Sequence, residues 1–310
     1  MKKFTIGAND AGQRLDKFAV KASSGLPLPL LHKAIRKRDV KINRRRCYCD
    51  TVLREGDVVE FYLDGEFFPP GENLEFLNAS KNFPHVYEDG NIIIAEKPAG
   101  LLSHGAEGDS ADNLVNRLKK YLYGKGEYLP ERENSFAPAI CSRLDRNTGG
   151  LVLCAKNAAA LREANRLLQD GYIEKYYIAL LSGRLEQPAG LIEGALSRDG
   201  GSRKSYVSQE GKASKSAYKL LAVQGGNSLA EVRIFTGRTH QIRAHFAATG
   251  HPIAGDAKYG GKALAGFRSQ ALYSYRLKFN VSLEHALSYL NGKEFFAENL
   301  PGWAASVRIL

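Results

Sequence analysis

The sequence has few cysteines and lacks any long apolar segment. Its 310 residues include 4 Cys, which is too few for the disulfide framework of a small secreted domain. No run approaches the ~18 apolar residues that mark a membrane span. The start, MKKFTIGAND, has two lysines without an apolar stretch after them, so we expect no secretory signal. Walker loops, dinucleotide-binding fingerprints and serine-hydrolase elbows are also absent from the sequence. These absences predict a cytoplasmic protein that does not span a membrane.

Basic residues are present in excess and are unevenly distributed. The chain has 44 Lys and Arg against 33 Asp and Glu, a formal net charge of +11, with 44% apolar residues to build a core. Residues 1–64 contain 7 Lys and 7 Arg against 8 acidic residues, so they carry a net +6, and the other 246 residues carry +5. A uniformly solvated surface would not concentrate charge in this way. The distribution therefore favours a polyanionic partner for the N-terminal segment.

The N-terminal segment has the pattern of a small helical and stranded module. Residues 13–20 and a stretch after Pro29 each have an apolar face at helical spacing, a short strand follows at 40–43, and residues 52–63 form a turn and a closing strand. This order, over residues 12–63, resembles the small RNA-binding domain first named for ribosomal small-subunit protein S-four. The resemblance implies that structured RNA binds to the basic residues of the second helix and the adjacent turn, namely Lys33, Arg36, Lys37, Arg38, Arg44, Arg45 and Arg46. Taken alone, three arginines in a turn are more often exposed charge without a partner.

The rest of the chain predicts a second, larger domain. Residues 64–85 contain Pro69-Pro70-Gly71 and no clean period, so we interpret them as a linker, with the large domain at 86–310. Apolar spacing predicts helices at 157–169 and 239–249 and a strand at 173–182. Strands outnumber helices there, and several strands are consecutive. The predicted fold class is α+β, with a small basic N-terminal module and a large domain built on an antiparallel or mixed sheet.

The segment RLDRNTGG, residues 143–150, carries the strongest chemical signal. Alternation along an expected strand at 139–145 would place Arg143 and Asp145 on one face, beside each other at the strand end. Nearby guanidinium groups would keep the carboxylate ionised. The alternative is that Asp145 has only a structural role, because Asp before Asn-Thr-Gly-Gly is common in turns.

This segment is similar to the R-L-D-R-x-T-(S/G)-G-L signature of the RluA family of pseudouridine synthases. Three further stretches agree in order, namely EKPAGLLSH (96–104), EKYYIAL (174–180) and GRTHQIRAHFAATGHPIAGDAKYGG (237–261). The chain departs from the family pattern at Ser142, where His is usual, and at Gly149, where Ser is usual.

The resemblance implies both a reaction and its residues. The family isomerises uridine to pseudouridine within RNA, without a cofactor or metal. The matching positions make Asp145 the catalytic carboxylate, Tyr177 the residue that stacks on the target base, and Arg243 the partner that holds Asp145 charged. Arg143 would fill the space that the flipped base leaves. The substrate RNA would also meet Arg238, Thr239, His240 and Gln241. Without the motif, Tyr177 would be an ordinary cross-strand aromatic and Arg243 a surface residue of a helix.

The hypothesis is therefore an RNA pseudouridine synthase, a monomer that acts by base flipping, with ribosomal RNA favoured and transfer RNA possible. One alternative is a non-catalytic RNA-binding or ribosome-assembly protein, and another is an N-glycoside hydrolase that would release free uracil. A metal site is not expected, because Cys47 and Cys49 lack a second ligand pair. On a helix, His240 and His245 would be ~140° apart.

Overall fold

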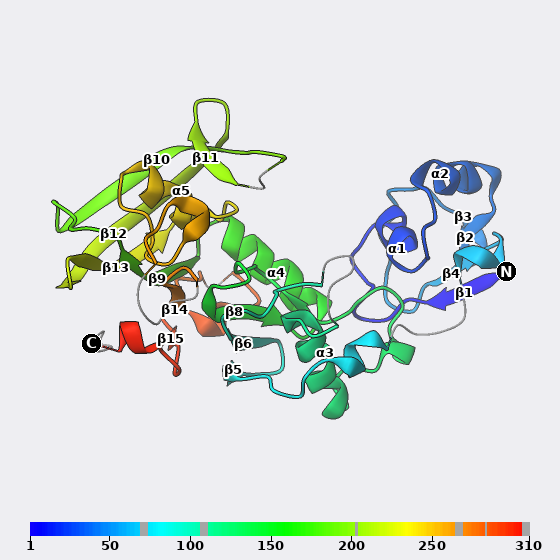
Figure 1. Ribbon diagram of the computed structural model, residues 1–310. Coiled ribbons are helices and arrows are strands. Elements are labelled where there is room, and N and C mark those ends of the chain that lie inside the picture. Colours follow the sequence, from blue (N-terminus) through cyan, green and yellow to red (C-terminus); the bar gives the residue numbers. More distant parts are fainter. Residues whose placement is uncertain (69–73, 106–110, 202–203, 264–268, 283, 306–310) are drawn as a thin grey trace.

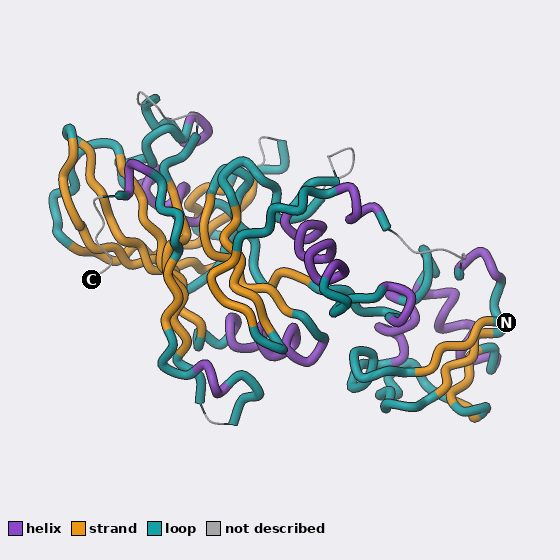
Figure 2. The backbone as a smooth tube through the Cα atoms, turned by 90° about the horizontal axis from the view of Figure 1, so that it is seen from below, coloured by secondary structure: helices purple, strands orange, loops and turns teal. Residues whose placement is uncertain are grey.

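The chain forms two separate sheets, each with its own hydrophobic core (Figure 1). The structure is a computed structural model that describes residues 1–68, 74–105, 111–201, 204–263, 269–282 and 284–305. Figures 1 and 2 show the small N-terminal sheet at one end of an elongated molecule and the large sheet at the other. The predicted α+β class, with a large mixed sheet, is confirmed.

The small sheet is antiparallel and has the strand order β1-β4-β2-β3. Its elements are β1 (Lys2–Thr5), α1 (Leu15–Lys21), α2 (Leu28–Lys37), β2 (Val40–Ile42), β3 (Arg45–Arg46) and β4 (Val58–Phe61). Both helices bury their apolar faces against the sheet, with Phe18 and Leu31 fully buried beside Phe61. The first strand, β1, lies before residue 12, where the resemblance to the RNA-binding domain begins.

The large sheet has 11 strands within the described residues, in the order β11-β10-β12-β13-β9-β14-β8-β6-β5, with β15 on β14 and β7 on β8. The strands are β5 (His85–Glu88), β6 (Ile92–Lys97), β7 (Ala139–Ile140), β8 (Gly149–Ala155), β9 (Ile173–Leu181), β10 (Ala189–Arg198), β11 (Ser205–Ser208), β12 (Lys212–Gln224), β13 (Asn227–Ile234), β14 (Leu272–Phe279) and β15 (Glu294–Phe296). Every residue of β6 and β8 is buried, which is consistent with the apolar sequence of β8 and of the first four residues of β6.

Three helices pack on the large sheet: α3 (Leu114–Gly124), α4 (Ala158–Gln169) and α5 (Gln241–Ala248). Two of them begin at an asparagine whose side chain accepts a hydrogen bond from the first turn. The Asn113 side chain accepts from Asn116 N at 3.0 Å, and the Asn157 side chain accepts from Ala160 N at 2.8 Å. These caps fix where α3 and α4 start. No helix in the described ranges is long and apolar enough to cross a membrane.

The two halves of the sheet join where β8 pairs in parallel with β14, through Gly149 with Tyr273 and Gly150 with Ser274. Gly150 has φ +110°, and a Cβ there would lie 2.0 Å from Ser274 O, so only glycine fits. A Cβ at Gly149 would lie 2.6 Å from the Tyr273 ring. This contact gives a physical reason for the departure from the family serine at position 149.

Polar contacts connect the small domain to the large one. The Asp10 carboxylate accepts hydrogen bonds from Asn134 Nδ2 at 2.7 Å and Ser135 Oγ at 2.6 Å. Asn9 Nδ2 donates to Glu133 Oε1 at 2.8 Å, and its Oδ1 accepts from the backbone N–H of Ala158, at the start of α4, at 2.9 Å. The expected linker, 64–85, contributes to both cores, with Phe68 in the small one and Phe76 and Phe83 in the large one. Residues 69–73 of that stretch lie outside the described residues.

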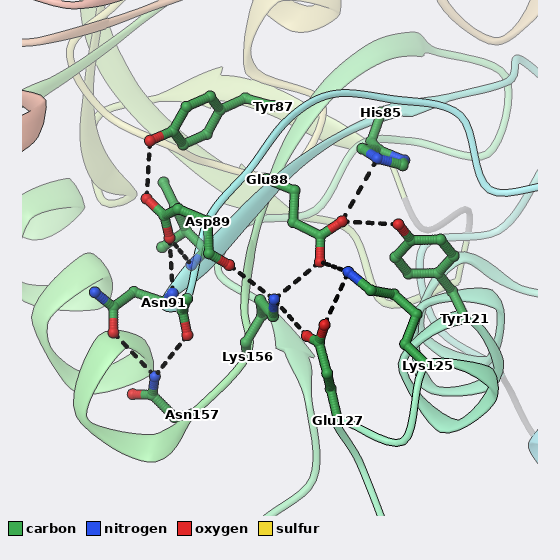
Figure 3. A network of polar contacts seen from close by, with 12 residues as sticks. His85, Tyr87, Glu88, Asp89, Asn91, Tyr121, Lys125, Glu127, Lys156 and Asn157 are labelled. Carbon is green, nitrogen blue, oxygen red and sulfur yellow. Dashed lines mark hydrogen bonds and ion pairs between the residues drawn. The ribbon is translucent and has the colours of Figure 1, made fainter.

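A polar network joins β5 to α3 and to the turn between β8 and α4 (Figure 3). The carboxylate of Glu88 accepts from Lys125 Nζ at 2.6 Å, from Lys156 Nζ at 2.9 Å and from Tyr121 Oη at 2.7 Å. Glu127 adds a second carboxylate to both lysines. Burial opposes the shift, but these hydrogen bonds lower the pKa of Glu88 to about 2.

Candidate active site

Asp145 lies in a turn between β7 and β8, not at the end of a strand. The expected strand at 139–145 was wrong beyond Ile140, because the chain leaves the sheet after β7. The backbone of Leu144 pairs instead with the Ser103 side chain, whose Oγ donates to Leu144 O at 2.7 Å and accepts from Leu144 N at 3.1 Å. The turn closes with Thr148 N donating to Asp145 O at 3.0 Å. Asp145 therefore sits on a loop that is anchored on both sides.

Arg243 connects Asp145 to a second, buried carboxylate. Its Nη1 donates to Asp145 Oδ2 at 2.8 Å, while Nε and Nη2 donate to the two oxygens of Asp256 at 2.6 and 2.9 Å. The Asp256 side chain is 1% exposed and that of Asp145 is 25% exposed. Although burial acts in the opposite direction, the two carboxylates raise the pKa of Arg243. The fork on Asp256 fixes the guanidinium plane, so Nη1 is aimed at Asp145.

A cleft of about 770 Å³ opens above Asp145 and is lined by Tyr177, Arg243 and Leu272. Tyr177 is 6% exposed, and burial, together with the nearby Asp145 charge, raises the pKa of its phenol. The phenol therefore stays neutral at physiological pH. The predicted catalytic residues Asp145, Tyr177 and Arg243, from a turn, a strand and a helix, thus line one cleft of a size suited to a small ligand.

Lys97, at the end of β6, holds the loops beneath Asp145 together. Its side chain is fully buried, and its Nζ donates to Pro98 O at 3.0 Å, Leu101 O at 2.7 Å and Arg146 O at 2.9 Å. Burial lowers the pKa of Lys97 to about 7, against the attraction of Asp145. Three carbonyl acceptors match the three N–H groups of an ammonium ion, so this geometry fits the charged form.

The predicted RNA-contacting stretch before α5 contains residues with different surroundings. Arg238 and Thr239 are exposed and line the cleft. His240 has a left-handed backbone, with φ 53°, and its Nε2 lies 3.8 Å from Asp145 Oδ2. Burial lowers the pKa of His240, which favours a neutral imidazole beside the carboxylate. Its Nδ1 is 2.9 Å from Tyr259 Oη.

Gln241 also lines the cleft, but the residue is 3% exposed and its amide is hydrogen-bonded within the protein. Its Oε1 accepts from Thr236 Oγ1 at 2.7 Å and from Arg238 N at 3.1 Å, and its Nε2 donates to Ser216 Oγ at 2.9 Å. These contacts favour a role in positioning the loop. Arg143, by contrast, is exposed at the edge of the cleft, where RNA could reach it.

The seven basic residues predicted to bind RNA in the small domain are all exposed: Lys33, Arg36, Lys37, Arg38, Arg44, Arg45 and Arg46. They belong to α2, its left-handed C-cap at Arg38 (φ 68°), and the β2–β3 hairpin, whose turn contains Arg44 (φ 62°). The hairpin lies beside α2 at one edge of the small domain (Figure 1).

Sequence reasoning missed the residues that support the site. Asp256 belongs to the long GRTHQIR…GDAKYGG match and Lys97 to EKPAG, so both motifs were noted without a role for either side chain. Both act by contacts across the fold that sequence spacing does not reveal. His245 is fully buried between Ser214 and Ser216, with ring nitrogens 2.8 and 3.1 Å from their hydroxyls. Among the described residues, no group of three or more His, Cys, Asp or Glu side chains could hold a metal ion.

Comparisons of this chain with known proteins agree on one family. The profile of the RNA pseudouridylate synthases matches residues 91–248. A ribosomal large subunit pseudouridine synthase C from Haemophilus influenzae is 30% identical over 93% of both chains, and its counterpart from Escherichia coli K12 is 31% identical over 84% of this chain and 81% of that one. An uncharacterized RNA pseudouridine synthase from Aquifex aeolicus is 33% identical over 81% of this chain and 78% of its own.

Solved structures share the fold. Human RNA pseudouridylate synthase domain containing 4 aligns with a TM-score of 0.55 and 19% identity, over 72% of this chain and 90% of that one. Human RNA pseudouridylate synthase domain containing 1 aligns with a TM-score of 0.52 and 21% identity, over 77% and 96%. At these identities the likeness concerns the fold alone.

Proposed function

The chain belongs to the RluA-type RNA pseudouridine synthases, and we propose that it modifies ribosomal RNA of the large subunit with Asp145 as the essential carboxylate. The observation that carries the assignment of Asp145 is its 2.8 Å contact with Arg243 at the base of the cleft that Tyr177 lines. The ribosomal target is supported by the relatives whose names specify the large subunit, one of which matches over 93% of both chains.

The reaction exchanges one bond of the sugar for another. The bond between the sugar and the ring nitrogen of uracil breaks, and a bond from the same sugar carbon to carbon 5 of the base forms. Carbon 5 loses its proton to solvent, and the ring nitrogen gains one, so the reaction needs no oxidant or reductant. Positive charge develops on the sugar as the first bond breaks, and a carboxylate can stabilise that charge or add to the sugar covalently.

The geometry suits each demand of this reaction. The target base must leave its stack to reach Asp145, which costs a few kcal/mol. Stacking on the Tyr177 ring would offset part of that cost. Arg243, held by Asp256, orients the Asp145 carboxylate, and the neutral phenol of Tyr177 does not add a second negative charge beside it.

The small domain would provide affinity for the RNA. Its exposed cations on α2 and the β2–β3 hairpin can pair with phosphates and release counterions, which gives strong binding with little reading of sequence. The cleft would then select the uridine that is flipped.

The test is release of tritium from a large-subunit ribosomal RNA transcript that carries uridine tritiated at carbon 5. Wild type is expected to release tritium and Asp145→Asn to release none above background. Asp64→Asn, which removes an exposed carboxylate of the small domain, serves as the matched control and should match wild type. Equal release by Asp145→Asn would refute the role of Asp145. Release from transfer RNA transcripts alone would refute the ribosomal target.

A further inference from the structure

Lys175 is a cation in the cleft to which the proposed mechanism gives no role. It lies on β9 two residues before Tyr177, so both side chains point to the same face of the sheet, about 7 Å apart along the strand. Lys175 and Tyr177 both line the cleft. An ideal Cβ on Gly237, in the loop before α5, would be 3.5 Å from Lys175 Nζ.

The strand neighbours of Lys175 are apolar. Its cross-strand neighbours are Ile234 on β13 and Leu277 on β14, which are 9% and 3% exposed, and Ile173 precedes it on the same face of β9. None of these side chains can accept a hydrogen bond or carry negative charge. Burial accordingly lowers the pKa of Lys175, with no opposing attraction from a carboxylate.

Other lysines of this chain with little exposure have their partners within the protein. Lys97 donates to three carbonyls, and Lys156 is paired with Glu88 and Glu127. Within the described part of the chain, Lys175 has neither an ion pair nor a hydrogen-bond acceptor. An uncompensated charge beside isoleucine and leucine is unfavourable in the free protein. Such a local conflict is expected where a ligand completes the site.

We propose that the Lys175 ammonium binds a backbone phosphate of the RNA, next to the nucleotide whose base stacks on Tyr177. A phosphate oxygen supplies the negative charge and the acceptors that the ammonium lacks, and a lysine suits it as a point charge. The spacing along β9 separates the phosphate contact from the base contact by about 7 Å, a distance that a nucleotide spans from base to phosphate. Lys175 then positions the strand in the cleft, and Asp145 carries out the chemistry. This inference rests on the proposed function.

The first test compares Lys175→Met with Lys175→Arg and with Lys219→Met. Lys219 is an exposed lysine on β12, opposite Glu231, so it lies on the other face of the sheet. Lys175→Met should raise KM for the tritiated transcript about tenfold and change kcat little, Lys175→Arg should restore most of the affinity, and Lys219→Met should behave as wild type. A large loss of kcat at unchanged KM, or no change in either, would overturn the proposal.

Binding alone distinguishes failure of this inference from failure of the proposed function. Affinity for the same transcript is measured against salt concentration by filter binding, which needs no turnover. Lys175→Met should reduce the slope of log affinity against log salt by about 0.7 to 0.9, the value of one phosphate contact. Urea unfolding should show the variant to be at least as stable as wild type, because an unpaired charge has left apolar surroundings. An unchanged slope, or a marked loss of stability, would indicate a structural lysine instead.

The contact can then be located on the RNA. Short RNAs around the mapped uridine, each with one neutral methylphosphonate linkage, are titrated with wild type and Lys175→Met. Wild type should lose affinity at one linkage beside the target, and Lys175→Met should lose nothing further there. Equal losses for both proteins at every linkage would overturn the phosphate assignment.

Discussion

The proposed active site depends on how one guanidinium group is shared between two carboxylates. Arg243 directs two donors to Asp256, which is buried, and one to Asp145, which faces the cleft. An arginine with only the Asp145 contact could rotate away, because a single hydrogen bond does not fix the guanidinium plane. We therefore propose that Asp256 is a positioning residue, whose effect on the reaction is transmitted through Arg243.

Replacement of Asp256 by Asn should lower kcat for tritium release about 10- to 100-fold while KM changes little, because the carboxylate at the reacting centre is then poorly oriented. The matched control is Asp112→Asn. Asp112 also accepts two hydrogen bonds from an arginine, Arg117 of α3, at 2.7 Å each, and neither residue lines the cleft. Similar losses of kcat in the two variants would mean that a general weakening of the fold is responsible.

Sequence periodicity predicted the helices and strands that have a clear apolar face. It failed where a side chain, instead of a neighbouring strand, forms hydrogen bonds with the backbone. The helix expected at 157–169 is α4, and the strand expected at 173–182 is β9. The helix expected at 239–249 begins only at Gln241, because His240 takes a left-handed conformation. The strand expected to reach Asp145 stops at Ile140, because the Ser103 hydroxyl, 41 residues away, pairs with the Leu144 backbone. No local pattern encodes that contact.

The candidate site was also predicted only in part from the sequence. Motif positions indicated Asp145, Tyr177 and Arg243, which do line one cleft. The parallel pairing of β8 with β14, which the glycine at position 150 permits, joins segments more than 120 residues apart and could not be read from spacing. Asp256 and Lys175 were missed for a related reason, since a buried carboxylate and an unpaired lysine are recognised only from their surroundings.

The network around Glu88 stabilises the edge of the large sheet, and its contribution should depend on pH. The pKa of Glu88 is lowered to about 2 in the folded chain. The unfolded chain therefore binds more protons than the folded chain between about pH 4.5 and 2. The stabilisation is present above about pH 4.5 and is lost as the pH falls through this window. Because the Glu88 side chain is 15% exposed, this stabilisation amounts to at most about 3 kcal/mol.

Glu88→Gln should therefore reduce the free energy of unfolding in urea by about 2 kcal/mol at pH 7, and the difference from wild type should shrink toward pH 3. Glu186→Gln, at an exposed carboxylate, should differ little from wild type at either pH. A deficit for Glu88→Gln that is the same at pH 7 and pH 3 would show that charge at Glu88 is not its source.

For the whole molecule, the two domains combine a basic surface with a fixed attachment. The hydrogen bonds of Asn9 and Asp10 to residues 133–135, and of Asn9 to the start of α4, hold the small domain against the large one. The small domain, with residues 1–64 at a net +6, is thereby set at one end of the molecule, away from α5 (Figure 1). An RNA that bridges the two domains would place its phosphates against the basic surface of the small domain and reach the cleft of the large one.

Replacement of Arg44, Arg45 and Arg46 together by Ser should weaken RNA binding and reduce the slope of log affinity against log salt by about 2 to 3, because each lost phosphate contact removes about 0.7 to 0.9. At saturating RNA, kcat should stay close to wild type, since the hairpin does not line the cleft. The control replaces three exposed cations outside the small domain, Lys81, Arg132 and Lys293, by Ser and so removes the same net charge. If both triple variants lose the same slope, the overall charge of the chain attracts the RNA; if only the first does, the hairpin is its docking surface.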